Sequence, residues 1–189
     1  FSENVFYHEV NIAKYPLFEY APYETALAGK MVDIVQSAHL DILHVHYAIP
    51  HASAALVAKQ ILAQQGITIP VVTTLHGTDI TLVGREMTYE HVVSWSINQS
   101  DAVTAVSEDL RKQTYEHFKI NRDIDVIPNF IDFGRFNKKP REHFKQMIAP
   151  NGEKIIIHTS NFRKVKRIED VIAVFAQIIK EIPAKLLLI

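Results

Sequence analysis

The sequence predicts an α/β fold built on parallel sheets. Short apolar runs rich in β-branched residues alternate with amphipathic stretches of helical period through most of the 189 residues. Continuous apolar runs of this length are typical of parallel strands buried by helices. A polar, basic stretch interrupts the alternation late in the chain, and a new strand–helix–strand pattern follows it. We therefore predict two doubly wound parallel-sheet domains, both incomplete in this chain.

The individual elements follow from the period of the apolar residues. Expected strands are Val5–Val10, Ile42–Val45, Val71–Leu75, Ala102–Ala105, Asp123–Ile127, Ile155–His158 and Leu186–Ile189. Expected helices cover about 24–38, 52–65, 88–99, 107–118 and 168–181. Ser107 is expected to cap its helix, because its hydroxyl can accept hydrogen bonds from first-turn amides.

The domain boundary is expected after Pro128-Asn129-Phe130-Ile131-Asp132. We assign residues 1–135 to a first domain, 136–152 to a basic linker and 153–189 to the start of a second domain. The chain opens at Phe1 without a methionine and closes on the apolar run Ala184–Ile189, which reads as a strand. These ends suggest an internal piece of a longer protein that lacks the first strand of its first domain.

Composition excludes several classes of function. The net charge of −1 creates no overall field that favours nucleic acid or a membrane surface. The absence of cysteine excludes disulfides, thiolate metal sites and a cysteine nucleophile, and it fits a reducing, cytoplasmic location. No apolar run reaches the roughly 18 residues of a membrane-spanning helix. The sequence says nothing about oligomeric state, and we also consider a homo-oligomer.

A basic turn is the most informative segment. Arg163, Lys164, Lys166 and Arg167 place four cations in five positions between an expected strand and an expected helix. Ligands of α/β sheets bind beyond the carboxyl ends of strands, near helix N-termini that attract anions. The turn is therefore a candidate phosphate or diphosphate site. The alternative is a solvated basic turn without a ligand.

Histidines follow two other expected strands. His44 and His46 should share one strand face, and His76 follows the next strand. A metal site there would need a third ligand, and only Asp79 is near in sequence, so we expect polar histidines at the sheet edge and no metal.

Gly77 lies between His76 and Thr78, where it permits a positive φ or close approach of the backbone to a ligand. Together with Gly84, it could let Thr78, Asp79 and Thr81 present hydroxyl, carboxylate and amide groups to a polar substrate. An ordinary strand-to-helix turn is the equal alternative.

Several motifs in order resemble one enzyme family. The motifs are Leu43-His44-Val45-His46-Tyr47-Ala48-Ile49-Pro50-His51-Ala52, Thr73-Thr74-Leu75-His76-Gly77-Thr78-Asp79-Ile80-Thr81, Ser100-Asp101-Ala102-Val103-Thr104-Ala105-Val106-Ser107, Val126-Ile127-Pro128-Asn129-Phe130-Ile131-Asp132 and Ser160-Asn161-Phe162-Arg163-Lys164-Val165-Lys166-Arg167. The whole resembles the retaining nucleotide-sugar glycosyltransferases of the GT-B fold, family-four type. It is most similar to the branch that glycosylates L-malate at the first step of bacillithiol biosynthesis.

The resemblance implies transfer of N-acetylglucosamine from UDP-N-acetylglucosamine (UDP-GlcNAc) to the hydroxyl of L-malate, with retained anomeric configuration. It implies two Rossmann-like domains, with the acceptor mainly on the first and the donor mainly on the second. It implies no cofactor and no required metal, because cationic side chains neutralise the diphosphate. It also implies that a Gly-rich loop precedes Phe1 and that donor-binding carboxylates follow Ile189.

The resemblance also assigns residues. Lys166 matches the lysine that binds the donor diphosphate, and the family's arginine five positions earlier falls on Asn161, for which Arg163 is the expected substitute. His76 matches the histidine that contacts the sugar near the reacting centre.

Tyr47, Gly77 and Thr78 fall in the acceptor-binding region. The helix before Ser100 lacks the family's usual basic residue, so Arg85 or His91 is expected to meet the malate carboxylates. Two alternatives stay open: the same fold with another sugar or lipid as acceptor, and a sugar- or phosphate-binding module without catalysis.

Overall fold

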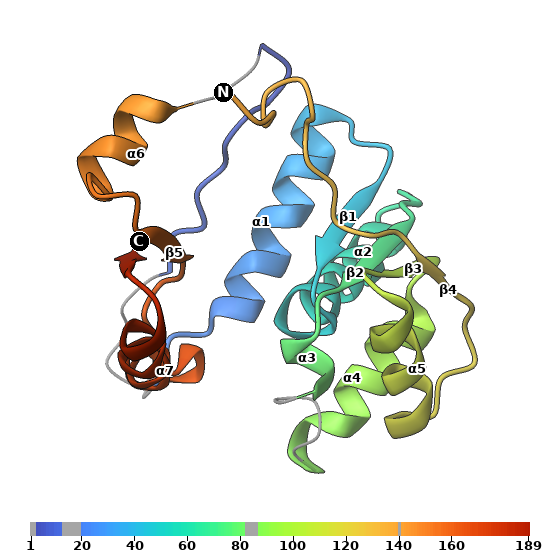
Figure 1. Ribbon diagram of the computed structural model, residues 1–189. Coiled ribbons are helices and arrows are strands. Elements are labelled where there is room, and N and C mark those ends of the chain that lie inside the picture. Colours follow the sequence, from blue (N-terminus) through green and yellow to red (C-terminus); the bar gives the residue numbers. More distant parts are fainter. Residues whose placement is uncertain (1–2, 13–19, 82–86, 140) are drawn as a thin grey trace. The chain divides into compact units, whose positions relative to one another are not determined.

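The computed structural model describes residues 3–12, 20–81, 87–139 and 141–189 (Figure 1). The chain divides into two compact units, Phe1–Phe130 and Ile131–Ile189. The first unit ends at Phe130, five residues before residue 135, where the sequence analysis places the end of the first domain. The stretch expected to be a linker belongs to the second unit and contains a helix, α6 (Glu142–Ile148).

The first unit is a four-stranded parallel sheet with helical connections. Its elements in chain order are α1 (Tyr23–Ala38), β1 (Leu43–His46), η1 (Ala48–Ala52), α2 (Ser53–Gln64), β2 (Val71–Leu75), α3 (Thr78–Thr81), α4 (Met87–Gln99), β3 (Ala102–Ala105), α5 (Glu108–His117) and β4 (Ile124–Val126). The strands pair in the order β1-β2-β3-β4 (Figure 1). All their carboxyl ends therefore meet at one edge.

The core of this unit lies on one face of the sheet. Leu43 and Val45 of β1 pack with Val32 and Val35 of α1 and with the apolar side of α2. Further along the sheet, apolar residues of α4 and α5 pack on β2 and β3; the cluster includes Leu75, Val93, Ile97, Val103, Ala105 and Leu110. Burying each large aliphatic side chain contributes about 1.5–3 kcal/mol, so this face stabilises the unit.

The opposite face of the strands carries polar side chains. The burial of β1 alternates, with Leu43 and Val45 buried and His44 and His46 exposed. The register places His46 beside Thr74, and Thr74 beside Thr104. A row of polar groups thus crosses three strands near their carboxyl ends.

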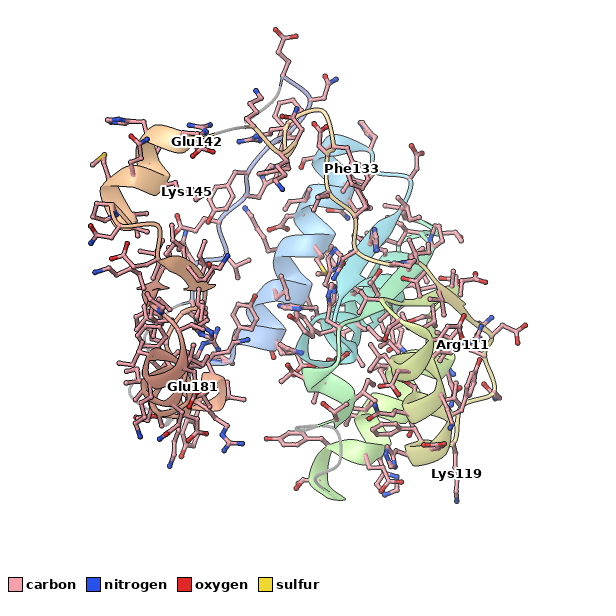
Figure 2. The ribbon with its side chains drawn as sticks, viewed as in Figure 1. Arg111, Lys119, Phe133, Glu142, Lys145 and Glu181 are labelled. Carbon is pink, nitrogen blue, oxygen red and sulfur yellow. The ribbon has the colours of Figure 1, made fainter. Side chains whose placement is uncertain are left out.

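The second unit begins a new sheet. Parallel strands β5 (Lys154–His158) and β6 (Ala184–Leu188) pair directly. The short 3-10 turn η3 (Lys164–Lys166) and helix α7 (Ile168–Glu181) connect them. Glu142 and Lys145 mark α6, and Glu181 marks the end of α7 (Figure 2).

Most of the predicted elements are confirmed. Val71–Leu75 and Ala102–Ala105 have the predicted limits, and helix 168–181 matches α7. The Ser107 cap is also confirmed, since the Leu110 amide donates to its hydroxyl over 3.1 Å.

The predicted strand Val5–Val10 is wrong. This segment has no regular secondary structure, and Val5 and Phe6 are 53% and 79% exposed. An apolar run forms a strand only where its backbone amides find a neighbouring strand edge. None of the described strands pairs with this segment.

Within its described ranges, the chain has no helix that is long and apolar enough to cross a membrane.

Asp101 joins the loop before β3 to the start of β2. Its carboxylate accepts a hydrogen bond from the Val71 amide at 2.7 Å and pairs with the Lys59 ammonium at 2.6 Å. Burial raises the pKa of the Asp101 carboxyl, but the hydrogen bonds from Lys59 and Val71 outweigh it, so its pKa is lowered from 3.8. The ionised carboxylate is therefore favoured in the folded protein.

We predict that Asp101→Asn destabilises the protein by about 1 kcal/mol at neutral pH, because a charge-assisted bond is lost at a site that solvent partly screens. Since the folded pKa lies below the unfolded one, this contribution is full above about pH 4 and is lost as pH falls through the folded pKa. Thermal unfolding of the full-length protein across pH 3–7 measures it. The Asn variant should lack that part of the acid destabilisation.

The matched control is Glu116→Gln. Glu116 pairs with Lys112 at 3.7 Å on the exposed surface of α5. This change should alter stability by less than about 0.5 kcal/mol. Equal losses in both variants would mean that the Val71 contact contributes nothing.

Candidate functional site

The first candidate site lies at the carboxyl edge of the sheet in the first unit. His44 and His46 are on β1, Tyr47 follows β1 directly, and His76 follows the end of β2. The rings of His44 and His46 are 5.0 Å apart, which confirms that they share a strand face. The parallel pairing of β1 with β2 brings His76, thirty residues later, to the same place.

Two imidazoles at this edge are joined by a hydrogen bond. His46 Nδ1 and His76 Nε2 are 2.7 Å apart. The Tyr47 ring also contacts His76, with ring centroids 5.0 Å apart. His76 therefore contacts two side chains from the end of β1, and its Nδ1 is the ring nitrogen that the bond to His46 leaves available.

A second polar connection runs across the sheet. His44 Nε2 and the Thr74 hydroxyl are 2.8 Å apart, and the Thr74 and Thr104 hydroxyls are also 2.8 Å apart. This line fixes the His44 ring against β2. It differs from the His46–His76 pair, which joins the last residue of β1 to the residue directly after β2.

The histidines influence one another's ionisation. Although His46 is exposed, partial loss of hydration where it packs against its neighbours lowers its pKa, and positive charge on His44, His76 and His51 would lower it further. The neutral imidazole of His46 is therefore favoured at neutral pH. A neutral His46 ring can form its hydrogen bond with His76 without the repulsion that two cationic rings would experience.

Asp79 organises the loops behind these side chains. Its side chain is 2% exposed; one carboxylate oxygen accepts from the Ala48 amide at 2.9 Å and the other from the Gly77 amide at 3.0 Å. The sequence-based suggestion that Asp79 faces a substrate is thus wrong. Both of its oxygens bind backbone groups in the loops after β1 and β2.

Two residues at this edge have unusual backbone angles. Gly77 has φ +119, and Tyr47 has φ 77. The positive φ of Gly77 bears out the conformational reason for expecting a glycine there. A positive φ at Tyr47 is unfavourable for a side chain with a Cβ and occurs where surrounding contacts impose it.

The other residues predicted to bind the acceptor are Thr78, Arg85 and His91. Thr78 begins the four-residue helix α3 and its side chain is exposed. Arg85 lies outside the described residues, as does Gly84. His91 lies on α4 and is exposed.

Within residues 3–12, 20–81, 87–139 and 141–189, no three histidine, aspartate or glutamate side chains are grouped to hold a metal ion. His44 and His46 each direct a ring nitrogen to a protein partner instead.

The second candidate site is the basic turn of the second unit. With its amide oxygen toward the guanidinium, Asn161 accepts from Arg163 Nε and Nη2 at 2.8 and 2.7 Å. Two of the five guanidinium N–H groups are used, so three can still bind an anion. Asn161 therefore orients Arg163, in addition to any contact of its own.

Lys166 and Arg167 differ in their surroundings. Arg167 has φ 50 at the N-cap of α7 and forms an ion pair with Asp170 in the first turn. Lys166 is exposed, and the described part of the chain offers it no carboxylate at ion-pairing distance. Its ammonium is thus the freer of these two charges.

A hollow of about 470 Å³ lies beside this turn. Lys166, Arg167 and Asp170 line it together with apolar residues of the strands and α7, namely Ile156, Val171, Val174, Phe175, Ile178 and Leu186. Its lining therefore combines three charged side chains with six apolar ones.

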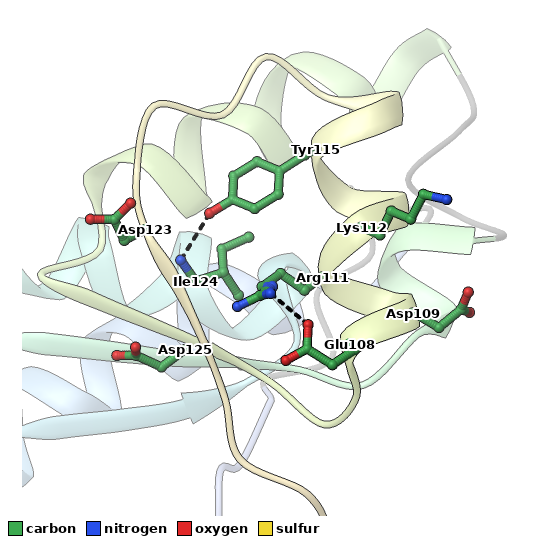
Figure 3. A pocket seen from close by; sticks show the side chains of 8 residues that line it. All are labelled: Glu108, Asp109, Arg111, Lys112, Tyr115, Asp123, Ile124 and Asp125. Atoms are coloured by element: carbon green, nitrogen blue, oxygen red, sulfur yellow. Dashed lines mark hydrogen bonds and ion pairs between the residues drawn. The ribbon is translucent and has the colours of Figure 1, made fainter.

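A third feature is a polar hollow of about 760 Å³ along α5, next to β4 (Figure 3). Glu108 and Arg111 form an ion pair there, and the Tyr115 hydroxyl accepts from the Ile124 amide (Figure 3). No residue that the sequence analysis assigned to a site lines this hollow.

Sequence reasoning missed the partnership of His46 with His76. It also gave no role to His51, whose Nδ1 lies 2.7 Å from the His46 carbonyl oxygen. The available signal was the position of each histidine at the end of an adjacent strand. It did not show which ring nitrogens would meet.

The chain matches the family model for Glycosyltransferase Family 4 over residues 1–135. The chain belongs to this family. It is 48% identical over 187 residues to an N-acetyl-alpha-D-glucosaminyl L-malate synthase of Bacillus anthracis, covering 98% of this chain and 48% of that protein. It is 30% identical over 100 residues to an uncharacterized glycosyltransferase of Methanocaldococcus jannaschii, covering 53% of this chain and 26% of that protein.

A solved structure establishes the fold of this family member. Sucrose-phosphate synthase from Thermosynechococcus elongatus superposes with a TM-score of 0.64 at 20% identity, covering 99% of this chain and 49% of that chain. The fold is therefore α/β with parallel sheets of the GT-B type, as predicted. The chain spans about half the length of the Bacillus relative, 48% of it.

We predict that Gly77→Ala costs about 1–3 kcal/mol of stability and lowers activity, because φ +119 is unfavourable for alanine. The new methyl group itself would meet open space. Backbone strain alone should move the loop that carries His76 and Thr78. Thermal unfolding and steady-state kinetics of the full-length protein measure the two effects.

Two controls separate the causes. Gly29→Ala, in α1 and also in open space, should stabilise by up to about 1 kcal/mol. Gly66→Ala, with φ +78 after α2, should destabilise but leave kinetics unchanged. Wild-type kinetics in Gly77→Ala would show that the loop after β2 does not position the site.

Proposed function

We propose that the protein to which this chain belongs is a retaining glycosyltransferase. It moves N-acetylglucosamine from UDP-GlcNAc to the hydroxyl of L-malate. We further propose that it acts in the cytoplasm, at the first step of bacillithiol biosynthesis, and that it requires no metal.

The main support is the Bacillus anthracis relative, whose name describes a product made of N-acetylglucosamine and L-malate. The matched region, with 48% identity, covers 98% of this chain. The polar sheet edge and the basic turn supply the two kinds of group that the reaction needs, namely contacts for a polar acceptor and cations for a diphosphate.

The reaction places definite demands on the donor site. The malate hydroxyl oxygen forms a bond to the anomeric carbon, the bond from that carbon to UDP breaks, and UDP leaves with the electron pair. The hydroxyl proton passes to the released UDP or to solvent, so the step balances without a further reactant. Negative charge grows on the diphosphate, so preorganised cations stabilise the transition state more than the ground state.

In our proposal, Lys166 and Arg163 supply these cations. Lys166 has no competing carboxylate among the described residues, and Arg163 keeps three donors beyond its bonds to Asn161. Arg167 is less suited, because Asp170 already pairs with it. Cationic side chains at the diphosphate take the part that a divalent metal would otherwise play.

We assign binding of the acceptor to residues of the first unit. Tyr47 and Thr78 follow the ends of β1 and β2, and Gly77 shapes the loop between His76 and Thr78. Hydroxyl and amide donors suit a dicarboxylate acceptor, with Arg85 or His91 as the proposed cation. His76 contacts the transferred sugar through Nδ1, the nitrogen that is not bonded to His46.

The decisive experiment is product analysis of the full-length protein with UDP-GlcNAc and L-malate. Mass spectrometry should detect the glycosylated malate, NMR should show the α-anomer, and EDTA should not reduce the rate. Transfer only to another sugar or to a lipid would replace malate as the acceptor. Binding without turnover would identify a binding module.

We predict that Lys166→Ala and Arg163→Ala each lower kcat/KM for UDP-GlcNAc about 10- to 100-fold, since a charge-assisted hydrogen bond is worth about 1.5–3 kcal/mol. The value of kcat should fall too, because the charge grows during bond cleavage. Lys164→Ala is the matched control from the same turn. Unchanged donor kinetics in both variants would remove the basic turn from the donor site.

We predict that Thr78→Val raises the KM for malate about 5- to 100-fold, which corresponds to about 1–3 kcal/mol for a lost polar contact. The KM for UDP-GlcNAc should stay the same, because valine nearly preserves the shape. Malate titration at saturating donor measures this effect. If Thr78→Val and Tyr47→Phe both keep the wild-type malate KM, the acceptor binds elsewhere.

A further inference from the structure

The proposed reaction assigns a role to His76 but none to its neighbour His46. His46 belongs to β1 and His76 to the loop after β2, so a contact between them couples two segments thirty residues apart. His46 is exposed and His76 half-buried, so burial alone does not explain why the two rings meet. The 2.7 Å separation of Nδ1 and Nε2 is that of a hydrogen bond.

The main chain on both sides of this bond is anchored. The Tyr47 amide donates to the Thr74 carbonyl at 2.9 Å, and His51 Nδ1 lies 2.7 Å from the His46 carbonyl oxygen. The Gly77 amide donates to Asp79. Both rings therefore start from fixed backbone positions, and their bond determines the remaining rotation of each ring.

The number of protons on the two rings determines whether His76 Nδ1 donates or accepts a hydrogen bond. Two neutral imidazoles carry one N–H each, and one of these protons must lie between the bonded nitrogens. If His46 donates, His76 Nδ1 carries the other proton and is a donor. If His76 donates, His76 Nδ1 is an acceptor. If the pair takes up one additional proton, the only unprotonated nitrogen lies in the bond, so His76 Nδ1 is a donor in either case. If the pair takes up a second proton, both bonded nitrogens carry N–H groups and the hydrogen bond is lost.

We propose that His46 is a positioning residue for His76: their hydrogen bond orients the His76 ring and presents Nδ1, in one protonation state, to the substrate. The inference rests on the proposed role of His76 in sugar transfer. His46 does not itself touch the substrate in this proposal.

The surrounding charges make the pair sensitive to pH. His44 of β1, His51 of η1 and His76 all face His46, and together with partial loss of hydration they lower its pKa. Among the described residues, the Asp79 carboxylate accepts from the amides of Ala48 and Gly77, so both of its oxygens are already bonded to the backbone of these loops. The lowered pKa shifts protonation of His46 toward more acidic pH. A proton on both ring nitrogens of His46 makes it the donor in the bond, which leaves the proton of His76 on Nδ1.

A pair of substitutions tests the bond. In His46→Asn, the side-chain amide can place a polar atom where Nδ1 now lies, and it does not titrate. In His46→Gln, the amide reaches the position of Nε2 instead and cannot make the same bond. The two variants are equally polar and uncharged, so a difference between them reports the geometry of the contact.

In the full-length enzyme with UDP-GlcNAc and L-malate, we expect His46→Gln to lower kcat about 10- to 100-fold, as a misplaced catalytic group does, with KM values nearly unchanged. His46→Asn should stay within about threefold of wild type, and the acid limb of its pH–kcat profile should move. His39→Asn, at the exposed C-cap of α1, is the matched histidine control and should match wild type. Equal kcat in His46→Gln and wild type would overturn the proposal.

A second readout needs no turnover. In the protein labelled with ¹⁵N-histidine, His76 should show two distinct ring nitrogens, one protonated and one not, in wild type and in His46→Asn. His46→Gln should show averaged tautomers. An unchanged His76 spectrum in His46→Gln refutes the positioning role. Absence of product from these substrates, with the expected spectra, would refute the proposed function and leave the His46–His76 coupling in place.

Discussion

The candidate site of the first unit depends on the Asp79 carboxylate. Its two oxygens accept the amides of Ala48 and Gly77, which belong to loops after different strands. A buried carboxylate is tolerated only when such donors satisfy it, and here each oxygen receives a backbone hydrogen bond. This one side chain thereby ties the loop after β1 to the loop after β2. These two hydrogen bonds also fix the backbone at Tyr47 and His76, which lie directly beside the two anchored amides.

Parallel pairing makes that arrangement possible. Because β1, β2 and β3 run in the same direction, their carboxyl ends deliver His46, His76 and Ser107 to one edge. The helices cover the face that carries Val45, Leu75 and Val103, so the apolar residues stabilise the sheet without occupying its edge. Polar residues at strand ends are then free to bind ligands, as in other α/β proteins.

In both units, polar or charged side chains gather where strands end, but the kinds of side chain differ. In the first unit, imidazole rings and hydroxyls gather at the ends of strands. In the second, the turn after β5 concentrates cations, and its geometry separates them: Asn161 orients Arg163, Asp170 neutralises Arg167 and Lys166 stays exposed. The number of charges in such a turn therefore matters less than which of them lack an internal partner.

The sequence by itself determined the parallel α/β class, the positions of most elements to within one or two residues, and the sheet edge at which the candidate histidines gather. These properties are local, since they follow from apolar periodicity, from the Ser107 cap and from polar residues at strand ends. Resemblance to a family added roles for His76, Lys166 and Arg163, which stay predictions.

Only the tertiary structure decided which groups meet. It showed that Val5–Val10 finds no strand partner, that Asp79 is buried on backbone amides and that His46 bonds His76. Each depends on segments far apart in sequence, and ring-nitrogen contacts depend on rotations that no spacing pattern records.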